Sequence, residues 1–235
     1  MNRQEAQYIN QFYEILAQIE ADIGGKQVLK NCDGYMPMPE RGVYFFFEPG
    51  EERTTSGEGL RCVRVGTHAL KKNSKTTLWK RLRQHRGTVR GRNPRSGNHR
   101  GSVFRYHVGT ALIERDHWPA EIARNWGGSN ASKNIKEIEI PLEKAVSKYI
   151  GSMPFIWLEI DDEPGPKSNR GYIERNSIAL LSNYHRESNP VDPSSQSWLG
   201  QRARSIEVQK SGLWNSNHVK DTIDRHFFDK LQSLV

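Results

Sequence analysis

The sequence predicts an α+β fold in which a small mixed three-stranded sheet is flanked by helices. Two β-rich runs stand close together at residues 42–50 and 60–66, and a third follows a long helical region at 154–161. Apolar residues at helical spacing mark both ends of the chain. The order of hairpin, helices, strand and helix therefore indicates a mixed core with helices added at both ends.

The chain length suits one core with terminal extensions. We expect an N-terminal helical extension at 1–39, a core at 40–186 and a C-terminal extension with a helix at 187–235. No apolar run approaches the length of a membrane span, and the first residues contain acids instead of an apolar signal segment. The two cysteines, Cys32 and Cys62, form no CxxC pair. We therefore expect a cytoplasmic protein with reduced thiols and no membrane partner.

Positive charge is concentrated in one block of the sequence. The chain has 35 Lys and Arg against 27 Asp and Glu, which gives a formal net charge of +8. Between Gly59 and Ile113 there is no acidic residue, whereas Lys and Arg recur throughout. A one-sided positive field attracts a polyanion, so the pattern predicts a nucleic-acid partner. The alternative is a solvated basic face without a partner.

The N-terminal part contains a predicted helix and a predicted hairpin. Residues 2–23 are expected to form a helix, because apolar residues recur three and four positions apart up to a stop at Gly24-Gly25. Residues 60–66 alternate apolar and basic side chains, as is typical of a strand. Together with the strand at 42–50 they predict a hairpin with a long polar tip.

The stretch TTLWKRLRQHRG at 76–87 predicts a short helix with an unusual buried face. Thr76 or Thr77 is a suitable N-cap, and Gly87 is a suitable C-terminal stop. One stripe of this helix contains Leu78, Arg81, Leu82 and His85. A need for solubility does not account well for a guanidinium and an imidazole on a stripe that faces the core. Arg81 and His85 are therefore candidate functional groups.

Loops and helices alternate in the remainder of the chain. Residues 87–101 have no hydrophobic period and predict a loop, and 102–116 predict a helix. A short helix at 141–150 precedes the third strand, and the helix RGYIERNSIALLSNYH follows it at 170–185, with Glu174 at the margin of its buried stripe. The tail is expected to end in an amphipathic helix through Val219, Ile223, Phe227 and Leu231.

An ordered set of short motifs resembles the GIY-YIG nuclease superfamily. The sequence GVY at 42–44 starts one strand, RVG at 64–66 lies in the next, LWKRLRQH at 78–85 forms a helix, and a glutamate lies on a later helix. The resemblance covers roughly residues 40–185. The long gap between the two half-motifs is most similar to the type II restriction endonuclease branch. The resemblance implies a phosphodiester hydrolase that acts on DNA with one Mg²⁺ per site.

The resemblance also implies which residues form the site. Tyr44 matches the tyrosine of the first half-motif, and Gly66 matches the glycine of the second. Arg81 matches the arginine of the family's helix, and His85 matches the Tyr or His one turn later. Glu174 matches the metal-binding glutamate.

One position departs from the family's pattern. The tyrosine of the second half-motif is replaced by Arg64, which resembles some restriction enzymes of the superfamily that have a basic residue there. The late asparagine of the family has no clear counterpart, and Asn183 and Asn189 are both candidates. We include Arg64 among the catalytic candidates.

These residue types suit phosphodiester hydrolysis. The phenol of Tyr44, with a reference pKa of about 10, can take a proton from the attacking water where neighbouring cations favour its phenolate. The expected cations are Arg64, Arg81 and His85. Arg81 can also hold two phosphate oxygens as they gain charge. The single carboxylate of Glu174 suffices for Mg²⁺, because this ion keeps most of its hydration shell.

Basic and amide side chains on the helix and the following loop are candidate DNA contacts. Arginine can contact phosphates or read guanine edges, and asparagine can pair with adenine. The candidates are Lys80, Arg83, Arg86, Arg90, Arg92, Arg95, Asn98 and Arg100, with Asn93 as a further amide. The alternative is a flexible basic loop that attracts phosphates without sequence preference.

The sequence therefore predicts a Mg²⁺-dependent DNA endonuclease, most similar to a type II restriction enzyme. Cutting both strands with one site needs two protomers or two successive nicks, so a homodimer on DNA is expected. A cognate methyltransferase encoded nearby is a further expected partner. Two alternatives stay open: a nucleic-acid-binding protein that has lost catalysis, with Arg64 as the sign of that loss, and a repair or RNA nuclease of the same fold.

Overall fold

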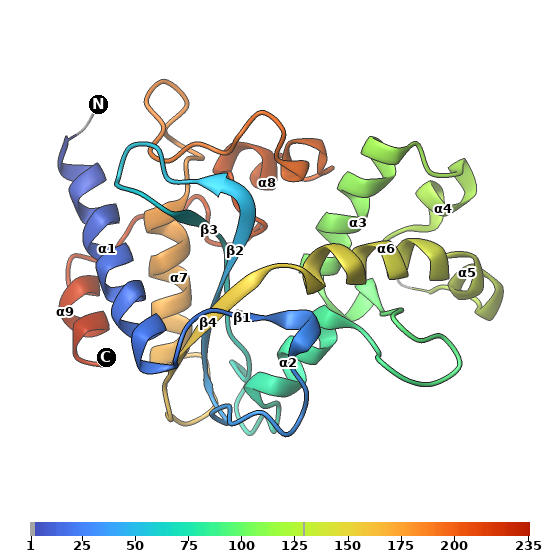
Figure 1. The fold of residues 1–235 in the computed structure, drawn as a ribbon, viewed down its shortest axis with the longest axis horizontal. Coiled ribbons are helices and arrows are strands. Elements are labelled where there is room, and N and C mark those ends of the chain that lie inside the picture. Colours follow the sequence, from blue (N-terminus) through green and yellow to red (C-terminus); the bar gives the residue numbers. More distant parts are fainter. Residues whose placement is uncertain (1–2, 129) are drawn as a thin grey trace.

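A small antiparallel sheet lies at the centre of the fold (Figure 1). The computed structural model describes residues 3–128 and 130–235. Within these residues one four-stranded sheet has the spatial order β1-β4-β2-β3. Its strands are β1 (Gln27–Val28), β2 (Gly42–Glu52), β3 (Leu60–Gly66) and β4 (Pro154–Glu159). Every neighbouring pair of strands is antiparallel.

The predicted α+β class, with a small sheet flanked by helices, is confirmed. The sheet itself differs from the expectation, because it has a fourth strand in the described residues and contains no parallel pair there. Strand β1 is only two residues long, and so short a segment has no period for the sequence to reveal. The long segment between β3 and β4 returns the chain so that Trp157 of β4 lies opposite Tyr44 of β2.

The alternation of side chains along β2 divides the interior into two cores. Tyr44 and Phe46 point into one core, whereas Val43, Phe45 and Phe47 point into the other. All of these side chains are buried. The strand GVYFFFE is therefore apolar almost throughout, because helices cover both faces of the sheet.

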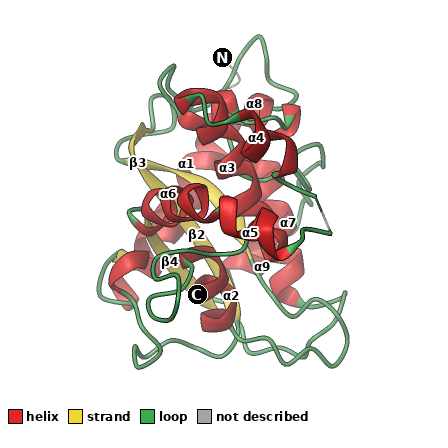
Figure 2. Cartoon of the chain, turned by 90° about the vertical axis from the view of Figure 1, so that its right-hand side faces the viewer, coloured by secondary structure: helices red, strands yellow, loops and turns green. Residues whose placement is uncertain are grey.

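Helices lie on both faces of the sheet, as Figures 1 and 2 show. Helices α1 and α7 contribute to the core of Phe45, and α2, α3 and α6 contribute to the core of Tyr44. In chain order the α-helices are α1 (Arg3–Asp22), α2 (Leu78–Arg86), α3 (Val103–Asp116), α4 (Ala120–Asn125), α5 (Lys133–Ile138), α6 (Ile140–Gly151), α7 (Asn169–Leu181), α8 (Ile206–Ser211) and α9 (Phe227–Gln232). Short 3₁₀ helices are η1 (Leu29–Asn31), η2 (His99–Gly101) and η3 (Leu199–Arg202). Among the described residues, no helix is both long enough and apolar enough to traverse a membrane.

The predicted C-terminal helix is wrong over its first half. Helix α9 begins only at Phe227, and Val219 and Ile223 lie in turns and irregular chain. The carbonyl of Val219 accepts a hydrogen bond from Ser182, and the amide of Asp224 donates to the side chain of Asn176. The apolar residues therefore recur because each packs into the core, and tertiary contacts take the backbone hydrogen bonds that a helix would need.

The C-terminal segment also covers the exposed edge of β3. The amide of Trp214 donates to the carbonyl of Val63 at 2.7 Å. The side chain of Asn215 pairs with Val65, accepting from its amide at 3.1 Å and donating to its carbonyl at 2.8 Å. These contacts satisfy backbone groups that an edge strand would otherwise leave free, and they fix the strand that ends at Gly66.

Candidate active site

The phenol of Tyr44 and the imidazole of His85 form a fully buried hydrogen-bonded pair. The hydroxyl oxygen of Tyr44 lies 2.7 Å from Nε2 of His85. The other ring nitrogen, Nδ1, lies 2.8 Å from the hydroxyl of Ser102. Both Tyr44 and His85 have a solvent-exposed fraction of 0%. A strand, a helix and a helix cap thus meet at one imidazole.

Helix capping places His85 at this point. The Thr77 side chain accepts from the backbone N–H of Lys80, and this cap starts α2 where the sequence predicted. The helix ends at Gly87, which has a φ of 86°. Between these ends, Leu78, Leu82 and His85 are buried on one side of α2.

Gly66 provides the space for the Tyr44 ring. The two residues are direct partners across β2 and β3. A Cβ atom added to Gly66 would lie 2.2 Å from the Tyr44 hydroxyl oxygen and 2.3 Å from the ring carbon Cζ. The glycine of the second half-motif is therefore required by the close approach of the phenol.

The expectation that His85 acts as a cation is wrong. Burial lowers the pKa of His85 well below its usual range, and the positive charges of Arg81, Arg64 and Arg105 lower it further. The imidazole is consequently neutral near pH 7, with one nitrogen protonated and the other an acceptor. His85 can donate or accept a hydrogen bond at Tyr44, but it adds no positive charge.

Arg64 is a buried cation next to this pair. Its side chain is only 6% exposed, and Nη1 donates to the carbonyl of Trp214 at 2.6 Å. The guanidinium also stacks over the ring of Phe104 at 4.8 Å. Burial lowers the pKa of Arg64, and the electrostatic neighbours that oppose this effect are Tyr44 and Glu174. Its Nε atom is buried and has no hydrogen-bond partner among the described residues.

Glu174 belongs to α7, and its side chain lies beside the end of β3, where it contacts Thr67 next to Gly66. Its Oε1 atom accepts from the backbone amide of Thr67 at 3.1 Å. Burial raises the pKa of Glu174, while the charge of Arg64 and the hydrogen bond from Thr67 oppose the rise. Helix α7 supplies this residue, and Ser168 caps the start of that helix by accepting from the amide of Gly171.

The donor set at Glu174 fits a hydrated Mg²⁺. The described residues contain no group of three or more His, Cys, Asp or Glu side chains that could enclose a metal. Only one oxygen of Glu174 makes a hydrogen bond within the described part of the chain, so the second is available to a cation. A single carboxylate suits Mg²⁺, which keeps several waters and adds substrate phosphate oxygens as ligands.

Arg81 lies at the solvent side of the site. Its side chain is partly exposed, and Nη1 donates to the Gln84 side chain at 3.0 Å and to the carbonyl of Gly101 at 3.2 Å. It is an electrostatic neighbour of His85, Arg64 and Glu174. The structure therefore brings all five sequence-predicted catalytic candidates into one neighbourhood.

Two histidines near the site had no role in the sequence interpretation. His68 is buried, its Nδ1 atom pairs with the carbonyl of Thr76, and burial lowers its pKa to about 4. Its Nε2 atom has no partner among the described residues. His218 in the C-terminal segment is an electrostatic neighbour of Glu174. No periodicity or motif marks either residue, because only the fold brings them to the site.

Neither asparagine considered for the late family position gains support. The side-chain amide of Asn183 donates to the carbonyl of Val191 and accepts from its backbone N–H, at 2.9 Å each. For Asn189 the recorded hydrogen bond joins its backbone amide to the carbonyl of Arg186. Asn183 is therefore an internal structural residue.

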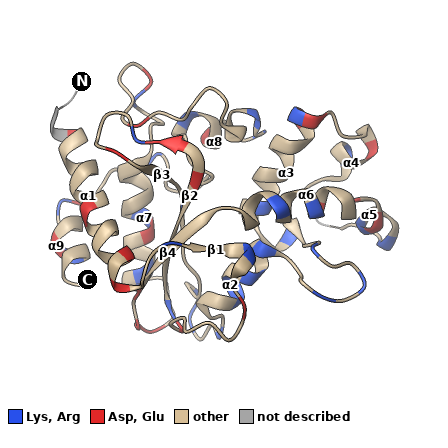
Figure 3. Ribbon diagram, in the orientation of Figure 1, with Lys and Arg blue, Asp and Glu red and all other residues tan. Residues whose placement is uncertain are grey.

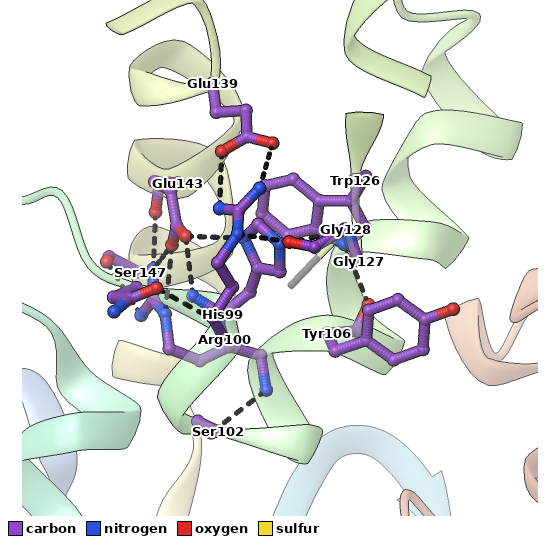
Figure 4. A network of polar contacts seen from close by, with 12 residues as sticks. His99, Arg100, Ser102, Tyr106, Trp126, Gly127, Gly128, Glu139, Glu143 and Ser147 are labelled. Carbon is purple, nitrogen blue, oxygen red and sulfur yellow. Dashed lines mark hydrogen bonds and ion pairs between the residues drawn. The ribbon is translucent and has the colours of Figure 1, made fainter. Parts of the chain in front are cut away.

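A buried ionic network supports the helix that holds His85 (Figure 4). Nη1 of Arg105 donates to the carbonyl of His85 at 2.8 Å and to the hydroxyl of Ser147 at 3.0 Å. Arg105 also pairs with Glu143, whose other oxygen accepts from the backbone amide and the ring of His99. Burial alone would raise the pKa of Glu143, but the hydrogen bonds from His99 and the charge of Arg105 outweigh it, and the net pKa is lowered.

The basic block is not one continuous exposed field, because several of its arginines are buried. Arg61, Arg64 and Arg105 are buried, and Arg61 pairs with Glu51 at 2.7 Å. Some of the remaining Lys and Arg side chains of the block are exposed, and others are held in contacts within the protein. The attraction for a polyanion therefore rests on fewer side chains than the sequence suggests.

The predicted DNA contacts divide in the same way. Arg86 donates to the carbonyl of Cys32 and stacks over Trp79, and Arg100 forms a two-point ion pair with Glu139. The other candidates are exposed, although Arg92 lies 3.6 Å from Glu137 and Asn98 caps η2. The exposed candidates are Lys80, Arg83, Arg90, Arg92, Arg95 and Asn98.

Comparison with known proteins gives one match. A family model described as the GIY-YIG domain matches residues 1–235. No curated protein matches the chain, and no solved structure matches it. The family match covers the terminal helices as well as the segment in which the motifs lie.

We predict that Gly66→Ala destabilises the protein by displacing the Tyr44 ring. Overpacking of a dense core costs about 1–3 kcal/mol, and each kcal/mol lowers the melting temperature by about 2–4 °C in a chain of this size. Thermal unfolding measures the change. The control is Gly165→Ala, where the added methyl meets open space. Equal melting temperatures for wild type and Gly66→Ala would contradict the packing described for Tyr44.

We predict that Glu143→Gln leaves Arg105 as a buried charge without its partner. Breaking a buried pair in this way costs about 3–5 kcal/mol, measured as the free energy of unfolding at neutral pH. The folded-state pKa of Glu143 is lowered, so its contribution is present above the unfolded pKa of about 4.3 and is lost as pH falls through the lower folded value. The two proteins should therefore converge in acid. Glu114→Gln, at an exposed position of α3, is the control. An equally large loss of unfolding free energy in Glu114→Gln would refute the role given to the Arg105–Glu143 pair.

Proposed function

Because the chain belongs to the GIY-YIG family of phosphodiester-cleaving endonucleases, we propose that it is a Mg²⁺-dependent DNA endonuclease, and more narrowly a type II restriction enzyme. The observation that supports this proposal is the grouping of a phenol, a neutral imidazole, two guanidinium groups and one carboxylate. These groups come from β2, β3, α2 and α7, which are far apart in the sequence.

Tyr44 is the proposed proton acceptor for the attacking water. Its oxygen lies 2.7 Å from Nε2 of a neutral imidazole. The Ser102 hydroxyl already accepts from the amide of Arg105, so its own proton can be donated to Nδ1 of His85. His85 then carries its proton on Nε2 and donates it to the Tyr44 oxygen. A donor directed at this oxygen stabilises the phenolate that a general base requires.

The two guanidinium groups have different proposed tasks. Arg64 is buried beside the phenol, where it places a positive charge next to the proposed base and makes no exposed contact. Arg81 is partly exposed and can present its planar fork to phosphate oxygens as they gain charge. In this arrangement the basic residue in the second half-motif supports catalysis and is no sign of its loss.

Glu174 is the proposed metal ligand, through the oxygen that Thr67 does not occupy. The chemistry that Mg²⁺ supplies when bound is charge neutralisation at the phosphate and at the departing 3′ oxygen. Burial raises the pKa of Glu174, and the charge of Arg64 and the Thr67 amide oppose part of that rise. The chain's own part is thus to orient one carboxylate beside Arg64.

The restriction assignment has further consequences. One site per chain supports a homodimer on DNA or two successive nicks, and a restriction enzyme requires a cognate methyltransferase to protect host DNA. The two free cysteines, Cys32 and Cys62, are buried and agree with a cytoplasmic location. The contacts proposed for DNA are the exposed residues Lys80, Arg83, Arg90, Arg92, Arg95 and Asn98.

A plasmid assay tests the proposed function. Wild type and Glu174→Ala are incubated with supercoiled DNA, with and without Mg²⁺. We expect cleavage only by wild type with Mg²⁺, and discrete fragments if it is a restriction enzyme. Binding without cutting in every sample would favour a nucleic-acid-binding protein, and cleavage of RNA alone would favour an RNA nuclease.

We predict that Tyr44→Phe lowers the cleavage rate by about 10²–10⁴, the usual contribution of a general base. DNA affinity should change little, because the lost hydroxyl is buried. Single-turnover cleavage and a binding titration separate the two quantities. Tyr13→Phe is the matched control, since that buried phenol accepts only a structural hydrogen bond from the amide of Cys62. A cleavage rate for Tyr44→Phe equal to that of the control would eliminate the proposed base.

A further inference from the structure

A large basic cavity lies outside the candidate active site. Its volume is about 1080 Å³, at the upper end of ligand-sized pockets. None of the five candidate catalytic residues lines it. Arg86 follows His85 in α2 but turns the other way, towards the carbonyl of Cys32 beside η1. The cavity therefore opens on a different side of α2 from Tyr44.

The described lining of this cavity is positively charged and contains no carboxylate. The cationic residues around it are Lys30, Arg86, Arg95, Arg115, Lys144 and Lys148. They come from η1, α2, the loop after α2, α3 and two successive turns of α6. Figure 3 shows the Lys and Arg positions of these segments in blue. Like charges held this close repel one another unless an anion lies among them.

Most of these charges are not neutralised within the described chain. Arg115 pairs with Asp116, and Arg86 is partly buried against Cys32 and Trp79. The other four form no ion pair or side-chain hydrogen bond among the described residues. Those four are Lys30, Arg95, Lys144 and Lys148, and all are exposed. Four cations without a partner in the described chain therefore surround one cavity.

We propose that this cavity binds the phosphate backbone of a DNA segment separate from the scissile phosphate. The inference rests on the proposed function, because it takes DNA as the substrate. The loop that forms one wall, through Thr88, Val89 and Arg95, also contains the exposed Arg90 and Arg92. The positive lining thus continues beyond the cavity, as a backbone that passes through it requires.

The lining favours a backbone over a small phosphorylated ligand. Three of the four unpaired cations are lysines, one on η1 and two on α6, and Arg95 on the loop adds the one unpaired guanidinium among them, so the charge is spread over three segments of the described chain. Most polar side chains of the lining already have partners, because Tyr149 donates to Glu48, Ser147 accepts from Arg105, and Thr88 and Ser152 donate to backbone carbonyls. Asn31 is the one lining amide, and its side chain makes no hydrogen bond among the described residues. The cavity is therefore suited to electrostatic contacts with backbone phosphates, which do not depend on the base sequence.

The test compares two charge-matched double variants in a Glu174→Ala background, which we expect to bind DNA without cutting it. Lys144→Gln/Lys148→Gln removes two charges from the cavity. Arg225→Gln/Lys230→Gln removes one exposed and one partly exposed charge at α9, at the opposite end of the molecule (Figure 1). Fluorescence anisotropy with a labelled duplex gives the affinity across a series of salt concentrations. Thermal unfolding of each variant verifies that it is folded.

We expect the cavity variant to bind the duplex about tenfold more weakly and to lower the slope of log affinity against log salt by about 2. The control should match the parent protein. Equal slopes for both variants would overturn the proposal, even where wild type cuts plasmid DNA and the proposed function stands. Tripolyphosphate is titrated as a second probe: tight binding that needs Lys144 and Lys148, with DNA affinity unchanged, would make the cavity a small-anion site and also overturn the proposal. If wild type does not cut DNA but the salt dependence of binding still falls in the cavity variant, the proposed nuclease function is rejected and the proposed DNA-binding cavity stands.

Discussion

The buried hydrogen bond between Tyr44 and His85 is the interaction on which the rest of the site depends. It joins β2 to α2 with no water between them, because both side chains are fully buried. Gly66 must lack a side chain for the phenol to lie where it does. Ser102 must cap α3 at this place for the second ring nitrogen to have a partner. One hydrogen bond therefore explains why a glycine, a serine and a histidine occupy fixed places in three separate elements.

The charge state of the groups around this hydrogen bond varies with how deeply they are buried. The deepest groups are neutral or paired, as His85 and the Arg105–Glu143 pair show. Arg64 keeps its charge in the interior with the help of Trp214, the Phe104 ring and the nearby carboxylate of Glu174. Cations that are free to meet a polyanion are left at the surface. The interior thus holds the phenol in position, and the surface supplies the attraction for DNA.

Local signals in the sequence predicted most of the elements and the type of fold. The caps at Thr77 and Ser102 and the stop at Gly87 have local physical causes, so α2 and α3 begin and end close to their expected limits. Strand β1 depends on tertiary contacts and has no local signal in the sequence. Around Val219 the apolar spacing indicated a helix, but tertiary contacts hold the chain in another course.

The candidate site shows the same division. The motifs indicated Tyr44 and Glu174, but the protonation of His85 depends on burial and on cations that only the fold brings close. His68, His218 and the lysines of α6 likewise reach their places through the fold. Their positions in the chain follow no pattern that sequence reasoning could use.

The protonation state and tautomer of His85 test the buried Tyr44–His85 pair most directly. Nitrogen-15 NMR of histidine-labelled protein reports both, and the signal of this residue among the 8 histidines is assigned by its loss in His85→Gln. We expect one neutral imidazole, protonated at Nε2, because burial lowers the pKa of His85 well below its usual range. An imidazolium signal, or a ring that titrates near its ordinary pKa, would show that the Tyr44–His85 pair is not buried and would contradict the mechanism built on it.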